Sequence, residues 1–499
     1  MEVIGRALDG ECIESIKYSH KQVPLLSSLK DYSMKSIACF DVPGHVRHQG
    51  VGILNYYFGE DFMRMDINSS PLMDNVSNPK GIIKKSQELL ADAYSSDDAF
   101  FITNGTTGAI QAMILSTINE GDKLLLPRNI HKSVINALVL SSGIPIFIQP
   151  EFDYDLGISL NLDSKNVKDA LKKHKDIKAL FLLNPTYYGA CSDLEEIINI
   201  CHERNVLVLV DEAHGAHFPF NDELPPSAMS LGADMSAVSI HKTGGALTQA
   251  SALLINNKNI NSSKVLQIIN MIQSTSASYL LMSSIDGARS NLVLNGEEQL
   301  SKALNLSRYA KARINKIKGI KVVSTENLNK EGVKFIDETK LCINVKGLNL
   351  SGLEVYDLLY EKFSVQVELG DLYNILALIS IGTTKEDVDK LIESLSMISK
   401  IYKRCKKIND IEIKPINPEL KLNPREAFYK GKEIVLIDDC IGRISGESIM
   451  AYPPGIPIVT PGEIITAEVI DYIKTLKGNN AYLSDMQDKT LETILVIKE

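Results

Sequence analysis

The chain has 499 residues, of which 44% are hydrophobic and 23% charged, so it can bury a large core and is long enough for about two to four domains. Its formal net charge of −9 gives no electrostatic reason to expect binding to nucleic acid or to an anionic membrane, and no apolar run approaches the length of a membrane span. The seven cysteines are scattered without a C-x-x-C pair, so we expect no metal site and no disulfide framework. The charged N-terminus lacks the apolar stretch of a signal peptide, so we expect a cytoplasmic location.

Short apolar runs alternate with helical segments between about residues 68 and 289. The predicted strands are 99–103, 122–127, 144–150, 178–185, 205–215 and 234–242, and the clearest helices between them are 108–119 and 193–205. This alternation predicts an α/β fold with a mostly parallel sheet and helices on both faces. Ligands of such sheets bind at the carboxyl ends of the strands.

The second half of the chain changes character. A long helical region is predicted at about 296–317, followed by a smaller α+β part with strands near 340–347 and 377–384. The polar stretch 405–428 carries three prolines and predicts a linker. We therefore divide the chain into five parts: an N-terminal segment (1–65), a large domain (66–295), a small α+β domain (296–404), the linker (405–428) and a C-terminal domain (429–499).

A glycine- and threonine-rich turn follows the first predicted strand. Asn104, Gly105, Thr106, Thr107 and Gly108 stand where that strand ends and a helix begins. Helix N-termini present unpaired N–H groups and the positive end of a dipole, so glycine with threonine hydroxyls at this point can hold a phosphate. Taken alone, the turn is better explained as an ordinary helix cap.

Three further residues stand at strand or helix ends. Asp211 ends an apolar strand, where a carboxylate needs a cationic partner or caps the next helix. His131 precedes a predicted helix and either caps it or stacks on a flat ring. Lys242 closes the run 234–242 and is followed by two glycines, which makes it either a solvated charge or a reactive amine. We call the turn at 104–108 the phosphate seat. A phosphorylated pyridine aldehyde needs such a seat together with a histidine, a carboxylate and a lysine, and the chain has all four.

The motifs around these residues resemble the Orn/Lys/Arg decarboxylase family of pyridoxal phosphate (PLP) enzymes, and in particular its short bacterial arginine decarboxylases. The resemblance covers nearly the whole chain and includes "PGH" (43–45), "FFITNGTTGA", "PRNIHKSV", "NPTYYG", "LVDEAHGAHF", "SIHKTGGALTQAS", "STSASYLLMSSIDGAR", "VQVELGDLYNILALISIG" and "GRISGESIMAYPPGIPIVTPGE". It implies the aspartate aminotransferase fold type, with a seven-stranded, mostly parallel sheet in a large PLP-binding domain, a small α+β domain and a C-terminal decarboxylase domain.

The resemblance also implies roles for individual residues. Lys242 matches the lysine that binds the cofactor aldehyde, Asp211 the partner of the pyridine nitrogen, Ala213 the small residue under the ring and His131 the histidine stacked on it. His214 matches a residue near the cofactor hydroxyl or the substrate carboxylate. The cofactor phosphate would be held by Gly105, Thr106, Thr107, Ser239 and His241, with Thr275 and Ser276 reaching the partner subunit's phosphate. Glu368 and Asp371 match an acidic segment near the distal end of the substrate.

Three departures from the family pattern stand out. Val46 follows "PGH" where a basic residue is common, the loop 71–81 has one acid and no histidine, and Thr383 stands where an aspartate is frequent. The first two positions lie near the mouth of the site in the family, so they bear on the choice of substrate.

The implied reaction is α-decarboxylation of a basic amino acid, with arginine preferred over lysine and ornithine and agmatine as a polyamine precursor. A homodimer or a dimer-based oligomer is expected. An aminotransferase would share the cofactor residues, but it usually binds the α-carboxylate with an arginine of the small domain, and no arginine lies between Arg313 and Arg404. An oxidase could also use this scaffold. A pseudoenzyme is the remaining hypothesis, and the joint presence of Lys242, Asp211 and His131 argues against it.

Overall fold

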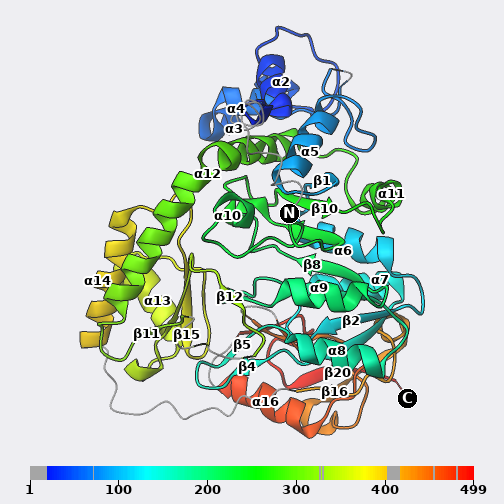
Figure 1. The fold of residues 1–499 in the computed structure, drawn as a ribbon, viewed down its shortest axis with the longest axis vertical. Coiled ribbons are helices and arrows are strands. Elements are labelled where there is room, and N and C mark those ends of the chain that lie inside the picture. Colours follow the sequence, from blue (N-terminus) through cyan, green and yellow to red (C-terminus); the bar gives the residue numbers. More distant parts are fainter. Residues whose placement is uncertain are drawn as a thin grey trace. The chain divides into compact units, whose positions relative to one another are not determined.

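The structure is a computed structural model that describes residues 19–70, 72–324, 328, 331–401, 416–452, 456–478 and 482–498 (Figure 1). The chain divides into two compact units, which are described separately. Unit 1 comprises residues 1–116 and 212–300, and unit 2 comprises residues 117–211 and 301–499. Within the described ranges, no helix combines the length and apolar character needed to cross a membrane.

Unit 1 contains three strands of the main sheet in the order β1-β10-β9. Strands β1 (Asp98–Ile102), β10 (Ser251–Ile255) and β9 (Met235–Val238) pair antiparallel, with Ile102 opposite Ser251 and Ala252 opposite Val238. The mostly parallel sheet that the sequence predicts therefore includes one antiparallel strand, β10, in this part. Strand β10 was not predicted, although its five buried residues are as apolar as those of its neighbours.

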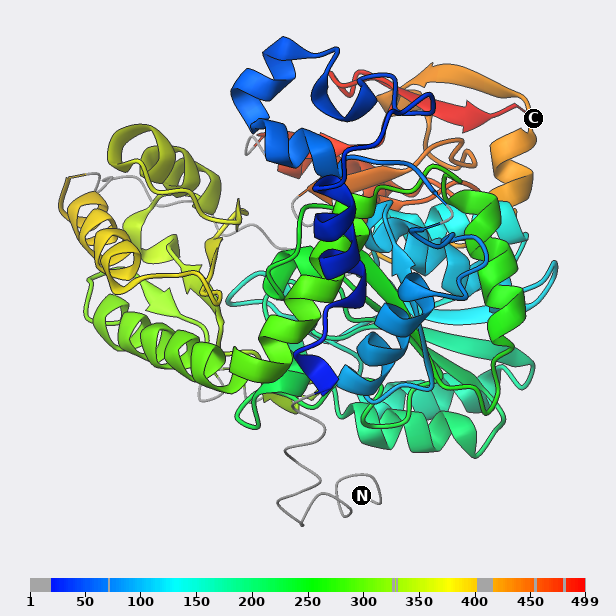
Figure 2. The same cartoon turned by 90° about the horizontal axis from the view of Figure 1, so that it is seen from above.

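The helices of unit 1 surround these strands. They are α2 (Pro24–Ser33), α3 (Gly52–Phe58), α4 (Glu60–Met65), α5 (Ile82–Ala93), the start of α6 (Gly105–Thr117), α10 (Ile240–Thr243), α11 (Ser262–Ile272) and the first part of α12 (Tyr279–Ile314). Helix α12 begins well before the predicted residue 296. Figure 2 shows α2 alongside α12, where Asp286 accepts a hydrogen bond from the Leu25 backbone N–H at 3.0 Å and pairs with the wholly buried Arg289 at 2.7 Å.

Unit 2 contains four strands of the main sheet in the order β8-β6-β2-β3, and each neighbouring pair is parallel. These are β2 (Lys123–Pro127), β3 (Ile144–Ile148), β6 (Ile177–Leu183) and β8 (Leu207–Asp211), and each matches a predicted strand. Helices α7 (Lys132–Ser141), α8 (Ser164–Lys173) and α9 (Leu194–His202) follow β2, β3 and β6 along the chain. The α/β class and the parallel arrangement are therefore confirmed here.

A smaller antiparallel sheet in unit 2 has the strand order β11-β13-β15-β14. Its strands are β11 (Lys321–Val322), β13 (Lys340–Asn344), β15 (Asn374–Leu378) and β14 (Leu369–Gly370), so the strand expected at 377–384 lies earlier in the chain. Helices α13 (Gly352–Phe363) and α14 (Lys385–Ile401), with the end of α12, contribute Leu359, Leu395 and Ile314 to its core (Figure 1). Short strands elsewhere in the unit are β4 (Phe152–Asp153), β5 (Ile158–Ser159), β7 (Ala190–Cys191) and β12 (Phe335–Ile336).

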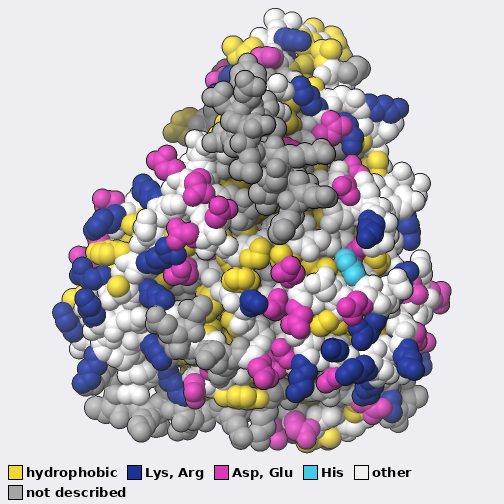
Figure 3. All heavy atoms as spheres, viewed as in Figure 1, with side chains coloured by type: hydrophobic (Ala, Val, Ile, Leu, Met, Phe, Trp, Pro, Cys, Tyr) yellow, Lys and Arg dark blue, Asp and Glu magenta, His cyan; other side chains and the backbone are white. Residues whose placement is uncertain are grey.

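The C-terminal part of unit 2 forms its own apolar cluster. Its elements are α15 (Pro424–Tyr429), β16 (Lys432–Leu436), β17 (Ile449–Tyr452), β18 (Ile456–Val459), α16 (Ala467–Gly478), β19 (Tyr482–Ser484) and β20 (Thr493–Ile497). Residues 405–415 of the predicted linker lie outside the described residues. The end of the linker is helical, because Asn423 and Glu426 form a capping box at the start of α15. Figure 3 shows acidic and basic side chains interspersed over one face of the molecule.

Candidate functional site

The predicted phosphate seat lies at the start of α6 in unit 1. Gly105 has φ +75°, a conformation that favours glycine, and a Cβ on Gly108 would overlap the Asn104 side chain. The Thr106 hydroxyl contacts the hydroxyl of Ser239 and lies 3.1 Å from that of Ser251. These three hydroxyls are buried beside the N-terminus of a helix of 13 residues, so donors and helix dipole together fit a bound phosphate.

The sequence predicts that Lys242 ends a strand, and this prediction is wrong. Strand β9 ends at Val238, and Lys242 lies in the one-turn helix α10. Its Nζ is 3.0 Å from Nε2 of His214, so the amine and the imidazole share a hydrogen bond. A Cβ on Gly244 would come within 2.9 Å of the Ile240 carbonyl oxygen, and Gly245 has φ +86°. Both glycines are therefore needed for the chain to leave α10.

His241, next to Lys242, has a perturbed ionisation. Burial lowers its pKa from the ordinary value of 6.5; its hydrogen-bonding contact with the Ala250 carbonyl opposes that effect, and the charge of Lys242 adds to it. A neutral imidazole at this position is therefore favoured more strongly than in an exposed histidine.

The segment that follows β8 holds several of the predicted residues. Asp211 is the last residue of β8, and its side chain is buried, as is that of Ala213. In unit 1, the Glu212 carboxylate accepts hydrogen bonds from the Ala228 backbone N–H at 2.8 Å and from the Ser236 hydroxyl at 2.9 Å. Glu212 was missed as a site-shaping residue, although a second acid directly after a strand-end aspartate is a visible signal. Its bonds hold the chain that carries Ala213 and His214.

His131 caps helix α7 in unit 2. Its Nδ1 accepts a hydrogen bond from the Ser133 backbone N–H at 3.2 Å and lies 2.8 Å from the Ser133 hydroxyl. The capping interpretation of this histidine is thus seen directly. These contacts also fix the orientation of the imidazole ring, which is what a ring-stacking residue requires.

The two acids expected near the distal end of the substrate differ in environment. Glu368 has an exposed side chain. Asp371 accepts hydrogen bonds from the Tyr188 hydroxyl at 2.7 Å, the Tyr373 N–H at 2.8 Å and the Asn374 N–H at 2.7 Å. Burial raises the pKa of Asp371 although these donors act in the opposite direction, and burial beside Asp371 raises the pKa of Tyr188 well above its ordinary value.

Thr275 and Ser276 lie exposed in the connection between α11 and α12. The Ser276 backbone N–H donates to the Ser274 hydroxyl at 3.2 Å, which shapes this polar turn. Within the described ranges, no group of three or more His, Cys, Asp or Glu side chains is arranged to hold a metal ion.

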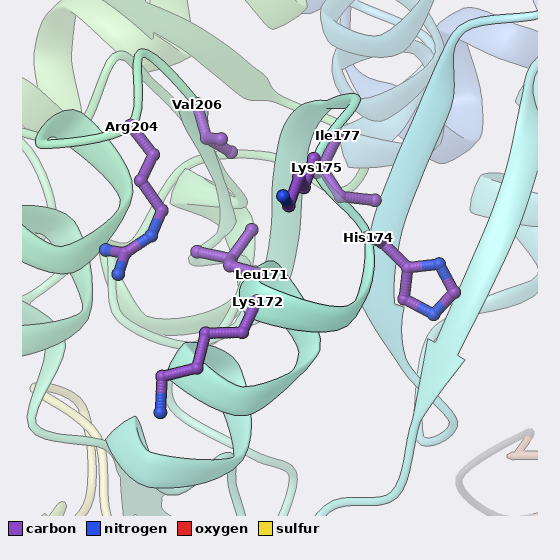
Figure 4. A pocket seen from close by; sticks show the side chains of 7 residues that line it. All are labelled: Leu171, Lys172, His174, Lys175, Ile177, Arg204 and Val206. Atoms are coloured by element: carbon purple, nitrogen blue, oxygen red, sulfur yellow. The ribbon is translucent and has the colours of Figure 1, made fainter.

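A surface pocket of about 370 Å³ lies in unit 2 near the amino ends of β6 and β8 (Figure 4). It contains none of the predicted site residues, and its lining combines cationic side chains with an apolar floor that includes Leu171, Ile177 and Val206. Two of the cations already have protein partners, because Lys172 pairs with Asp169 at 2.9 Å and Arg204 donates to the Ile200 carbonyl at 3.0 Å. The pocket lies at the amino ends of the strands, whereas the ligand of an open α/β sheet binds at their carboxyl ends.

Comparison with known proteins adds sequence evidence to this geometry. The family model for the Orn/Lys/Arg decarboxylase major domain matches residues 23–387, and that for the C-terminal domain of the same enzymes matches residues 408–483. The chain is 41% identical over 485 residues to a protein of Bacillus subtilis named arginine decarboxylase, an alignment that covers 96% of this chain and 99% of the relative.

Comparison with solved structures supports the fold. The crystal structure of a lysine decarboxylase from Francisella novicida is similar with a TM-score of 0.83 and 22% identity, covering 95% of this chain and 81% of that one. The ureidoglycine–glyoxylate aminotransferase of Bacillus subtilis is similar with a TM-score of 0.53 and 14% identity, covering 66% of this chain and 87% of that one. The predicted aminotransferase-type fold is confirmed by these two likenesses.

Proposed function

Since the chain belongs to the Orn/Lys/Arg decarboxylase family, and is thereby a decarboxylase, we propose that its substrate is L-arginine and that its products are agmatine and CO₂. The observation that carries this choice is the 41% identity to an arginine decarboxylase over nearly the full length of both chains. Agmatine is a precursor for polyamines, so polyamine biosynthesis in the cytoplasm is the proposed context.

The proposed cofactor is PLP, because the residues present fit its groups. The α6 N-terminus, with Gly105, Thr106, Thr107, Ser239 and His241, would hold the phosphate, and Lys242 would bind the aldehyde carbon. Asp211 would face the pyridine nitrogen, with Ala213 beneath the ring and His131 stacked on it. When bound, this cofactor supplies an electron sink for the pair of electrons left on the α-carbon as CO₂ departs.

The protein groups then have separate tasks. With the cofactor bound, the negative charge of the buried Asp211 carboxylate would favour a proton on the pyridine nitrogen. His214 can accept a proton from the Lys242 ammonium, because Nζ and Nε2 are 3.0 Å apart, and this leaves a nucleophilic amine. After CO₂ has left, Lys242 or His214 returns one proton to the α-carbon, which completes the amine product.

We place the recognition of the substrate's distal cation at Glu368 and Asp371. Glu368 has an exposed carboxylate that can pair with a guanidinium in two-point fashion. Asp371 would support this segment, since its oxygens accept bonds from Tyr188, Tyr373 and Asn374 and so fix the turn after Glu368.

The proposed assembly is a homodimer or a dimer-based oligomer, in which the exposed Thr275 and Ser276 serve the cofactor phosphate of the partner. The surface of α3 supports association. None of the seven described residues of α3 is buried, and Tyr56, Tyr57 and Phe58 are 82%, 72% and 59% exposed. A contiguous apolar surface of this kind marks an interaction site.

The division of the chain into five domains and segments remains our proposal.

The proposed function is tested by offering arginine, lysine and ornithine separately to the PLP-loaded protein and identifying products by mass spectrometry. We expect agmatine to form fastest. Formation of cadaverine or putrescine in its place would overturn the choice of arginine, and a keto acid as the main product would indicate an aminotransferase.

A further inference from the structure

We propose that the C-terminal part of the chain positions His131, and that the ion pair between Arg128 and Glu463 is the principal link. Arg128 stands three positions before His131 in the segment that joins β2 to α7. Both residues and the C-terminal elements belong to unit 2. The inference rests on the ring-stacking role proposed for His131, and it assigns a positioning task to residues remote in sequence.

The Arg128 guanidinium is held almost entirely by the C-terminal part. Its NH1 contacts Oε1 of Glu463, and its NH2 donates to Oε2 of Glu463 at 2.8 Å and to the Ile458 carbonyl at 2.9 Å. Its Nε donates to the Pro457 carbonyl at 3.3 Å. Arg128 is 4% and Glu463 0% exposed, so water screens this pair little. A buried, bidentate contact of this kind fixes the position and orientation of the Arg128 guanidinium relative to the Glu463 carboxylate.

The other end of the pair is equally constrained. Glu463 accepts a further hydrogen bond from the Thr460 backbone N–H at 2.7 Å, so its carboxylate cannot swing to follow a moving arginine. On the opposite side, the Arg128 guanidinium lies 4.7 Å from the ring centroid of Phe147. The backbone N–H of Arg128 donates to the Ile148 carbonyl at 3.1 Å, which ties the residue to β3.

Helix α7, which His131 caps, is also held by C-terminal residues at both ends. At its start, Lys132 pairs with Asp485 at 3.0 Å. At its end, the Arg425 guanidinium donates to the carbonyls of Val139 at 3.1 Å and Leu140 at 3.3 Å, which caps the last turn. Because His131 Nδ1 is committed to this helix, a shift of α7 or of the segment before it shifts the imidazole ring.

The test compares Glu463→Gln, the double variant Arg128→Met/Glu463→Gln and, as a matched control, Asp286→Asn, which breaks the equally buried pair with Arg289 in unit 1. Hydrogen exchange is measured on the cofactor-free proteins. We expect exchange in residues 129–141 to be about tenfold faster in the first two variants and unchanged in the control. Unchanged exchange in residues 129–141 of both Glu463→Gln and the double variant would overturn the link, whether or not the protein binds PLP.

The positioning role needs a second readout. The double variant leaves no unpaired buried charge, so we expect its Tm to return close to that of the wild type. Its dissociation constant for PLP, followed by visible absorbance, is expected to stay about tenfold or more above the wild-type value, because the support of His131 is still missing. If the PLP affinity of the double variant recovers together with its Tm, the Arg128–Glu463 pair has a purely structural role and the proposal is overturned. Failure of the wild type to bind PLP would instead overturn the proposed function.

Discussion

The Nζ of Lys242 lies 3.0 Å from Nε2 of His214, although α10 carries the lysine and the segment after β8 carries the histidine. The contact places a proton acceptor directly against the lysine amine that the proposed reaction uses. It requires the chain to turn at Gly244 and Gly245, and it requires the bonds of Glu212 to Ala228 and Ser236 that hold the His214 segment.

Replacing His214 by Asn should lower kcat for agmatine formation by about 10²- to 10⁴-fold, which is the usual contribution of a positioned acid–base group. Tm should change little in comparison. The measurement is kcat and Tm of His214→Asn beside His174→Asn, since His174 lies in the surface pocket of Figure 4 and has no proposed role. A wild-type kcat in His214→Asn would show that Lys242 works without this partner.

Borohydride reduction of the PLP-loaded protein should leave a pyridoxyl group on Lys242, because an unprotonated lysine amine beside the phosphate seat attacks the cofactor aldehyde. Peptide mapping by mass spectrometry locates the adduct. Lys242→Ala should show none, while Lys334→Ala, which alters an exposed lysine paired with Asp193, should label as the wild type does. Labelling of a different lysine in the wild type would refute the cofactor assignment.

The lowered pKa of His241 should make the folded state less stable in acid. The folded-state pKa lies below 6.5, so the unfolded chain takes up its proton at a higher pH than the folded protein does. The stability contributed by the neutral imidazole is therefore present above pH 6.5 and is lost as the pH falls from 6.5 toward the folded-state pKa. Compared with His241→Gln, the cofactor-free wild type should lose Tm across that window. A Tm difference that stays constant with pH would contradict this.

Introducing charge on α3 should dissociate the proposed dimer. Tyr56→Glu/Tyr57→Glu is expected to sediment as a monomer at assay concentration with a Tm near that of the wild type, because neither ring is buried within the chain. Met271→Glu is the control, since Met271 is 78% exposed on α11. If the tyrosine variant remains a dimer, α3 is not the surface through which two copies associate.

Glu368→Gln should raise KM for arginine by about ten- to a hundredfold, because the distal guanidinium loses its charged partner. Tm should be unaffected, as the side chain is exposed. Glu361→Gln, an exposed acid on α13, serves as the control. Equal kcat/KM for arginine in wild type and Glu368→Gln would remove Glu368 from substrate recognition.

Much of this protein was readable from local sequence. The four parallel strands of unit 2, the turn at Gly105 and the helix after it were predicted because apolar runs, glycines and helix-capping residues act over a few neighbouring positions. The family was identifiable for the same reason, since its motifs are short and contiguous. The places of Lys242, Asp211 and His131 along the chain followed from these motifs.

Other features depend on partners far away in the sequence. Asp371 meets the Tyr188 hydroxyl across 183 positions, and Glu463 meets Arg128 across 335. The antiparallel direction of β10, and the place of Lys242 in a helical turn rather than at a strand end, were decided in the same way. A carboxylate has the same local sequence whether it faces solvent, substrate or a buried cation. Only the packing of distant segments removes water from a carboxylate and selects its partner. The tertiary structure alone therefore separates the exposed Glu368 from the half-buried Asp371, which accepts a hydrogen bond from Tyr188.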